Sequence, residues 1–211
     1  MCVIIHKPQN AEIPQDLLAA ALTLNRDGWG LMGFDAEGSV ILERHAESKQ
    51  VHILDALTRH RDAELVLHLR QRTRGAESIE NAHPFKLAER LYLMHNGTLP
   101  LGQHGGTQVA GRSDTWHFVQ DVLRPLHNYY PGLMADPAFL RVLELGLKPD
   151  NKMVLLDGRI GRIAILNRQH GAEFEGLWLS NTRWIDRRLL PLVHTPQAQL
   201  RSYSADELHF V

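Results

Sequence analysis

The sequence predicts an α+β protein in which β-sheets are layered with helices. Predicted strands come in runs, and predicted helices fall into two groups, so the pattern differs from a regular alternation of strand and helix. Hydrophobic residues make up 44% and charged residues 22%, the balance of a folded globular chain. The 211 residues can bury a substantial core, and no linker rich in Pro, Gly or Ser divides them. We therefore expect a single domain over residues 1–211.

The first elements follow from short apolar runs and the turn residues between them. Residues 2–6 form an apolar run typical of a buried strand. Residues 14–24 have helical composition, with a proline at the first helical position and a polar Asn-Arg-Asp-Gly sequence after the last. Residues 29–34 and 40–44 flank an Asp-Ala-Glu-Gly turn and predict a hairpin. Residues 49–59 predict a second helix.

The remaining elements are predicted in the same way. Residues 64–70 and 91–95 read as strands. Residues 113–127 give the clearest helix, because a Ser-Asp pair can cap its start and its apolar residues fall near helical spacing. Another helix is expected over residues 137–147. Further strands are predicted at residues 153–156, 162–167 and 176–179, and a short final strand at residues 208–211.

Charge, cysteine and histidine content exclude several classes of function. Lys and Arg number 23 against 24 Asp and Glu, so no strong field favours nucleic acid or an anionic membrane. No signal sequence or apolar run of about 20 residues is present, and a single cysteine excludes an internal disulfide, so we expect a cytoplasmic protein. The 13 histidines lack metal-ligand spacing, so we expect neither a metal nor another cofactor.

The only cysteine is Cys2, and its position allows two interpretations. In the first, Cys2 is a small buried hydrophobe at the start of a strand, the commoner situation for a lone cysteine. In the second, removal of Met1 leaves a thiol and a free α-amine on one residue, which is a nucleophile with its own base. The cysteine alone does not decide between them.

Polar sequences follow several predicted strands, and each has a simple structural explanation. The arginines of LHLRQRTRG could form a solvated face, Asn96-Gly97 is a strong hairpin signal, and Ser113-Asp114 could simply cap a helix. Taken with Cys2, however, they supply what cleavage of an amino-acid amide needs. A thiol attacks the amide, an Asn amide and a Gly N–H hold the oxyanion, a guanidinium binds a carboxylate, and an aspartate binds an ammonium. Glutamine is the obvious substrate of this kind.

The same segments carry a resemblance to a known family. They are Met1-Cys2, NRDGWG at 25–30, HLRQRTRG at 68–75, NAHPF at 81–85, HNGTL at 95–99 and SDT at 113–115. In this order they resemble the class II glutamine amidotransferases, whose glutaminase domains are N-terminal nucleophile hydrolases, and in particular the stand-alone members. The resemblance implies a four-layer αββα sandwich with Cys2 at the end of a central strand.

The resemblance also implies a role for each matching residue. Cys2 would be the nucleophile, with its own α-amine as the base, and Asn96 with the Gly97 N–H would form the oxyanion hole. Arg70 would bind the α-carboxylate of glutamine and Asp114 its α-amine. Supporting positions in the pocket would be Thr73, Gly75, Asn81 and His83. The expected reaction is hydrolysis of the γ-amide through a γ-glutamyl thioester on Cys2, without a metal.

Two alternatives to this function stay open, and the length of the chain bears on the fate of the ammonia. Val3, Gln71 and Arg74 differ from residues that are common in the family, which leaves open an N-terminal-nucleophile amidase acting on another amide, such as a related γ-glutamyl amide. A non-catalytic binding protein on the same fold is the more distant alternative. The sandwich needs most of the residues after Asp114, so ammonia for a synthesis would pass to a separate synthase.

Overall fold

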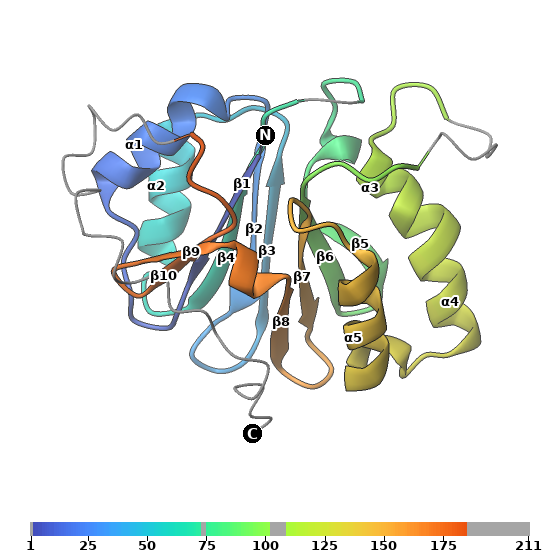
Figure 1. Ribbon diagram of the computed structural model, residues 1–211. Helices are drawn as coiled ribbons and strands as arrows, with labels where there is room; N and C mark the ends of the chain where they lie inside the picture. Colours follow the sequence, from blue (N-terminus) through green and yellow to red (C-terminus); the bar gives the residue numbers. More distant parts are fainter. Residues whose placement is uncertain (1, 73–74, 102–108, 185–211) are drawn as a thin grey trace.

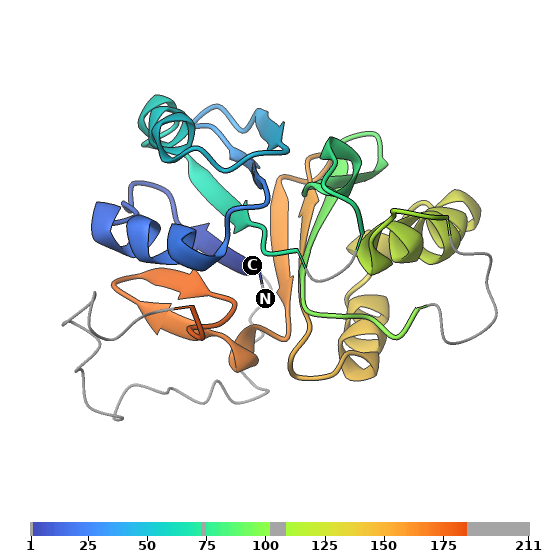
Figure 2. The same ribbon diagram turned by 90° about the horizontal axis from the view of Figure 1, so that it is seen from above.

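Two β-sheets pack face to face, and helices cover the outer face of each. The computed structural model describes residues 2–72, 75–101 and 109–184. Figure 1 shows the helices α1 and α2 on one side of the paired sheets and α3, α4 and α5 on the other, and the view from above in Figure 2 shows the same order of layers. The αββα sandwich expected from the sequence is confirmed.

The first sheet has six strands, and every recorded pair in it is antiparallel. In spatial order they are β3 (Val40–His45), β2 (Trp29–Phe34), β4 (Glu64–Leu69), β1 (Val3–Lys7), β10 (Leu177–Leu179) and β9 (Ala172–Phe174). The helices on this side are α1 (Gln15–Leu24) and α2 (Gln50–Arg59). Strand β1 is therefore interior, paired with β4 on one edge and with β10 on the other.

The second sheet has four antiparallel strands. In order they are β5 (Phe85–Ala88), β6 (Leu91–Asn96), β7 (Lys152–Asp157) and β8 (Arg162–Leu166). On its outer face the chain runs through α3 (Asp114–His117), the π-helical η2 (Phe118–Leu123) and α4 (Arg124–Tyr129), and later through α5 (Pro137–Gly146). Short 3₁₀ turns complete the connections: η1 (Ile79–Asn81), η3 (Leu133–Ala135) and η4 (Arg168–His170).

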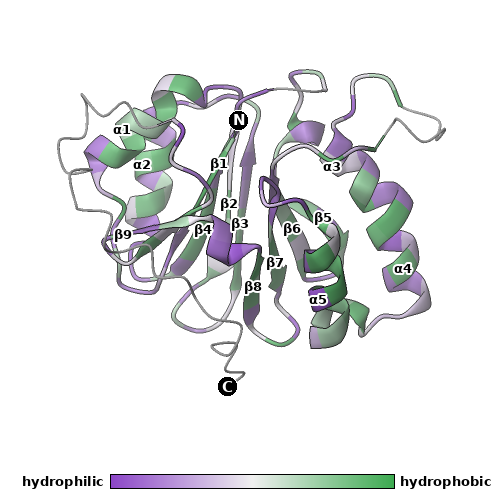
Figure 3. Ribbon diagram, in the orientation of Figure 1, coloured by the Kyte–Doolittle hydropathy of each residue, from purple (hydrophilic) through white to green (hydrophobic). Residues whose placement is uncertain are grey.

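Three apolar layers separate the four structural layers, which explains why the strands are hydrophobic on both faces. Along β1, Val3 and Ile5 pack toward the helices while Ile4 packs between the sheets. Trp178 on β10 faces the inter-sheet layer in the same way, as does Met94 on β6. Since successive side chains of a strand point to opposite faces, a strand covered on both sides needs apolar residues at every position. Figure 3, which is coloured by hydropathy, shows hydrophobic residues along the central strands.

The register brings several strand ends to one edge of the sandwich. Val3, the first residue of β1, lies opposite Leu69, the last residue of β4, and Leu69 also lies opposite Trp29, the first residue of β2. On the other edge of β1, Ile5 pairs with Leu179, the last residue of β10. The polar sequences that follow β4 and β10 therefore emerge beside Cys2.

Most of the predicted elements are confirmed, with two corrections and one prediction that stays a prediction. Strands β5 and β9 were not predicted, because at only 4 and 3 residues they are too short for an alternating pattern to stand out. The helix predicted over residues 113–127 is interrupted by the π-helical η2 and continues to Tyr129. The strand predicted at residues 208–211 lies outside the described residues.

Asn96-Gly97 is not a hairpin turn. Strand β6 pairs with β5 and β7, so the chain leaves the sheet after Asn96 and crosses to α3. Across the parts of the chain that the structure describes, no helix is long and apolar enough to cross a membrane.

A histidine pair lies where the two sheets meet. The rings of His68 and His83 have centroids 4.0 Å apart, and His83 also contacts Phe85 edge to face. Within the described residues, neither ring nitrogen of either histidine has a hydrogen-bond partner. Burial, together with the charges of Arg70 and His95, lowers the pKa of His68 to about 3, and burial holds the pKa of His83 well below its usual value. Both rings are therefore neutral in the folded protein at pH 7.

Gly30 provides a test of the packing between the sheets. A Cβ at this position would collide with the carbonyl oxygen of His83, so we expect Gly30→Ala to lower the free energy of unfolding by at least about 2 kcal/mol. Gly146→Ala is the matched control, because no heavy atom lies within 4 Å of a Cβ built there. Urea denaturation of both variants measures the difference, and equal stabilities would contradict this account of the contact.

The buried histidines also predict how stability depends on pH. The unfolded state takes up a proton on His68 near pH 6.5 but the folded state only near pH 3, so stability falls as pH drops below about 6.5. His68→Leu should reduce the loss of unfolding free energy between pH 7 and pH 5 by about 2 kcal/mol. His52→Leu, on the exposed face of α2, is the control and should keep the wild-type profile. A His68→Leu profile as steep as the wild type would show that another group causes the loss.

Candidate functional site

We call the edge of the sandwich where β4 and β10 end and β1 begins the convergent edge. Cys2 lies there, immediately before β1, and its side chain is only partly exposed. The backbone N–H of Gln71 donates to its Sγ over 3.4 Å, and the Sγ lies 3.3 Å from the carbonyl oxygen of Gln71. Two asparagine side chains donate to the carbonyl oxygen of Cys2, Asn96 at 2.5 Å and Asn181 at 2.9 Å. Cys2 is therefore held from three segments that are distant in the sequence.

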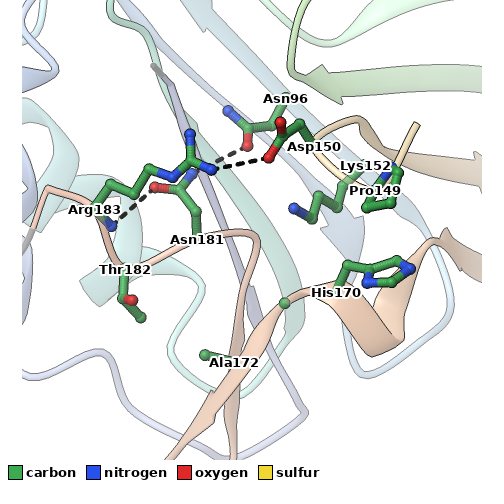
Figure 4. A pocket seen from close by; sticks show the side chains of 10 residues that line it. Asn96, Pro149, Asp150, Lys152, His170, Ala172, Asn181, Thr182 and Arg183 are labelled. Carbon is green, nitrogen blue, oxygen red and sulfur yellow. Dashed lines mark hydrogen bonds and ion pairs between the residues drawn. The ribbon is translucent and has the colours of Figure 1, made fainter. Parts of the chain in front are cut away.

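The Asn96-Gly97 segment is fixed by its neighbours. Asn181 Nδ2 also donates to Asn96 Oδ1 at 3.1 Å, a contact that Figure 4 shows as a dashed line. Gly97 has a φ of +143°, and a Cβ there would collide with the side chain of Asn151. Asn151 Oδ1 in turn lies 3.0 Å from Nε2 of the buried His95. Only glycine fits this position, so the direction of the backbone after Asn96 is set by packing.

Arg70 is buried at the end of β4. Only 4% of the residue is exposed, so the reading of these arginines as a solvated face is wrong for Arg70. Its backbone N–H donates to Gly28, and its guanidinium donates to the carbonyl oxygens of Asp27 at 3.4 Å and Ala76 at 3.3 Å. The guanidinium lies close enough to Cys2 for its charge to favour the thiolate form of the sulfur.

Asn81 connects the arginine segment to the start of α3. Its Nδ2 donates to the carbonyl oxygens of Ala76 at 2.9 Å and Gly111 at 2.8 Å, and its Oδ1 accepts from the Ser113 N–H at 2.9 Å. Gly75, with a φ of +79°, packs directly against Asn81. The sequence prediction that these residues shape a pocket stays a prediction, but the structure does place them together.

Asp114 connects the start of α3 back to the Asn96 segment. Its Oδ2 accepts from the backbone N–H of Leu99 at 2.6 Å, and its Oδ1 accepts from the N–H of Thr115 at 3.0 Å. Ser113 caps the helix, as its side chain accepts from the Trp116 N–H, so the capping interpretation is confirmed for Ser113 and does not account for Asp114. Asp114 therefore fixes the loop that follows Gly97.

These contacts, together with the short chain segments that join them, form a closed circuit around the convergent edge. In order it passes through Cys2, Gln71, Arg70, Ala76, Asn81, Ser113, Asp114, Leu99 and Asn96, and returns to Cys2. The structure thus brings together Cys2, Arg70, Gly75, Asn81, Asn96, Gly97 and Asp114. His83 lies beneath the circuit in the histidine pair, and Thr73 lies outside the described residues.

Burial favours the protonated form of the Cys2 thiol. Burial raises the pKa of the Cys2 thiol, while the Gln71 backbone contact and the charge of Arg70 oppose this increase. Burial lowers the pKa of Arg70, and the nearby Cys2 and Asp27 raise it. Attack by Cys2 at neutral pH therefore requires a base.

Three residues of the site were not identified from the sequence. Asn181 contacts both Cys2 and Asn96, Ser180 Oγ accepts from the Ile4 N–H at 2.8 Å, and Asn151 packs on Gly97. The sequence LSNTRW at 179–184 indicates no more than that Asn181 or Thr182 caps the segment that follows. The useful signal was its place near the end of a strand: Asn181 lies two residues after β10, Arg70 directly follows β4, and Asn96 is the last residue of β6. Among the side chains that the structure describes, no group of three or more His, Cys, Asp or Glu could hold a metal ion.

Comparison with known proteins identifies the family. The family model for glutamine amidotransferases class-II matches residues 18–155, a segment that contains Arg70, Asn96 and Asp114 and begins after Cys2. A search of curated proteins found no significant match.

Two solved structures are similar to this chain. For the glutamine phosphoribosylpyrophosphate amidotransferase of B. subtilis, complexed with ADP and GMP, the identity is 17% and the TM-score 0.48, over 84% of this chain and 40% of that one. For a glutamine aminotransferase class-II domain protein of Silicibacter pomeroyi, the values are 17% and 0.37, over 75% and 73%. The chain thus spans about 40% of the length of the B. subtilis protein.

The family match covers most of the chain, from α1 into β7, and includes every segment of the circuit except Cys2. Glutamine amide hydrolysis or transfer is the chemistry of this family. The chain belongs to the class II glutamine amidotransferases.

Proposed function

We propose that this protein hydrolyses the γ-amide of glutamine, or of a related γ-glutamyl amide, through a thioester on Cys2. The observation that carries the proposal is the closed circuit, because it places a thiol, an amide donor, a buried guanidinium and a carboxylate around one edge of the sandwich. A γ-glutamyl amide presents the complementary groups, which are a carboxylate, an ammonium and an amide carbonyl.

Cys2 would act as nucleophile once Met1 has been removed. Burial raises the pKa of its thiol, so a base must take the proton as the sulfur attacks. The freed α-amine has an ordinary pKa of roughly 7.7–8.0, so near neutral pH a substantial fraction of it is neutral and can accept the thiol proton. The α-amine belongs to the same residue as the thiol, so it lies close enough to accept the thiol proton directly or through a water molecule.

Asn96 and Gly97 would stabilise the tetrahedral intermediate. One hydrogen of Asn96 Nδ2 is used on the Cys2 carbonyl oxygen, which leaves the second for the developing oxyanion. The second donor would be the N–H of Gly97, the next residue, whose backbone conformation is restricted by the contact with Asn151. Donors fixed in advance stabilise the transition state without reorganisation.

Arg70 and Asp114 would hold the two ends of the glutamyl group. The guanidinium can bind the α-carboxylate through parallel hydrogen bonds, and the carboxylate of Asp114 can accept from the α-ammonium. Gly75, Asn81, His83 and Thr73 would support the pocket, with Asn81 acting through its hydrogen bonds to the two flanking loops.

The reaction balances within these groups. The thiol proton moves to the α-amine while the sulfur–carbon bond forms, and the same proton returns to the departing nitrogen as the carbon–nitrogen bond breaks. Water then cleaves the thioester to give glutamate and restores the thiol. The ammonia would leave free or pass to a separate synthase.

Intact mass spectrometry tests the nucleophile. The wild-type protein should lack Met1 and gain one adduct with 6-diazo-5-oxo-L-norleucine, an alkylating glutamine analogue, and excess glutamine should prevent the reaction. Since Cys2 is the only cysteine, Cys2→Ala should gain no adduct. A retained Met1, or a wild-type thiol that stays unmodified, would contradict the mechanism and favour a binding protein.

Removal of the oxyanion donor should affect turnover more than binding. We expect Asn96→Ala to reduce kcat for glutamine by roughly 10²–10³-fold, since it removes a donor that acts in the transition state. Asn128→Ala, on the exposed face of α4, is the matched control and should keep the wild-type rate. Steady-state ammonia release gives both constants, and an Asn96→Ala variant with unchanged kcat would remove Asn96 from the mechanism.

A further inference from the structure

A cavity lies on the far side of Cys2 from Arg70. Its volume is about 310 Å³, enough for a group of amino-acid size. It opens between the end of β10, η4 and the start of β7 (Figure 4). The residues that matter for its chemistry are Asn96, Asp150, Lys152, His170, Asn181 and Arg183.

Lys152 gives this cavity an unusual property. The residue is 5% exposed, and Figure 4 shows its side chain pointing into the space between Asn181 and His170. Within the described part of the chain, its ammonium has no recorded hydrogen bond or ion pair. Burial lowers the pKa of Lys152, the charge of Arg183 acts in the same direction, and Asp150 opposes them. An ammonium that faces a cavity from a largely buried residue loses part of its hydration, so an anionic ligand in the cavity would stabilise its charged form.

The other charged groups leave the cavity with a surplus of positive charge. Arg183 forms an ion pair with Asp150 at 2.9 Å, so these two charges largely offset each other. The charge of Lys152 then remains, and the imidazole of His170, which also lines the cavity, adds a hydrogen-bond donor. A carboxylate at this point would meet a cation and polar donors.

Glutamine has no group that needs this cavity. Its carboxylate and ammonium are assigned to Arg70 and Asp114, and its amide nitrogen carries only hydrogens. Strands β4 and β10 flank β1 on opposite edges, so Arg70 and the cavity lie on opposite sides of Cys2, with Asn96 at the boundary. A substituent on the amide nitrogen would extend from the attacked carbonyl away from the glutamyl pocket.

We propose that the cavity binds the carboxylate of an amino-acid group attached to the amide nitrogen, so that the substrate is a γ-glutamyl amino acid. This inference rests on the proposed function and names its substrate class. Lys152 would bind the carboxylate, and His170 and Asn181 would contact the same group. The leaving amine would then be an amino acid rather than ammonia, and the covalent steps would be unchanged.

Binding to a catalytically inactive variant tests the proposal. In Cys2→Ala, isothermal titration should give a dissociation constant for γ-glutamylglycine about tenfold lower than for γ-glutamylethylamide, which lacks the carboxylate. Adding Lys152→Met should abolish this difference. Lys86→Met, on the exposed side of β5, is the matched control and should preserve it. Equal affinities for the two amides, or a difference that survives Lys152→Met, would overturn the inference.

The same variants separate this inference from the proposed function. If Cys2→Ala binds glutamine but does not distinguish the two amides, the function stands and the inference fails. If it binds none of the three, the proposed function fails, and N-acetylglycine then tests the cavity alone because it carries only the amine-side half. Binding of N-acetylglycine by ligand-observed NMR that is lost in Lys152→Met supports the cavity, whereas no such binding overturns it.

Discussion

Strand β1 is held on both edges by hydrogen bonds and on both faces by apolar layers, and the position of every other part of the site depends on it. Its partners β4 and β10 are antiparallel to it, so both end where β1 begins. Val3, Ile4 and Ile5 are fully buried, and a shift of one residue would move each to the wrong layer. Cys2 therefore has a defined position although it precedes the strand.

The circuit converts this constraint into a site. Each segment that enters it leaves a strand end or begins a helix, and its polar groups bind backbone atoms of the next segment. Such contacts satisfy the N–H and C=O groups that irregular backbone would otherwise bury without partners. The residues that could bind a substrate are consequently also residues that hold the loops together, so folding and site geometry are coupled.

The sequence predicted the parts of this arrangement that depend on local patterns. Buried strands appear as continuous apolar runs because both faces are covered, and Ser113 caps its helix as its type and position indicate. The short strands β5 and β9 could not be predicted, since pairing with a neighbour rather than their own residues defines them.

Long-range contacts account for the residues that the sequence did not reveal. Asn181 lies 179 residues from Cys2 along the chain, and only the register of β10 against β1 brings them together. Lys152 was not singled out from the sequence, because nothing near it indicates that it lines a cavity together with Pro149, His170 and Arg183. The resemblance to a family supplied the expected roles of Arg70 and Asp114. Residue types alone would have left them as a surface arginine and a helix cap.

The orientation of Asn96 follows from contacts that exist before any ligand binds. Its Oδ1 accepts from Asn181, and one of its Nδ2 hydrogens is used on the Cys2 carbonyl oxygen. With these two contacts made, the amide plane is fixed, and the direction of its remaining N–H is fixed with it. The same amide lies at the edge of the cavity that contains Lys152, so a group bound there and a group bound at Arg70 would both be positioned against one rigid donor. Preorganisation of this kind favours a transition state over a flexible ground state, because the donor does not need to be oriented during the reaction.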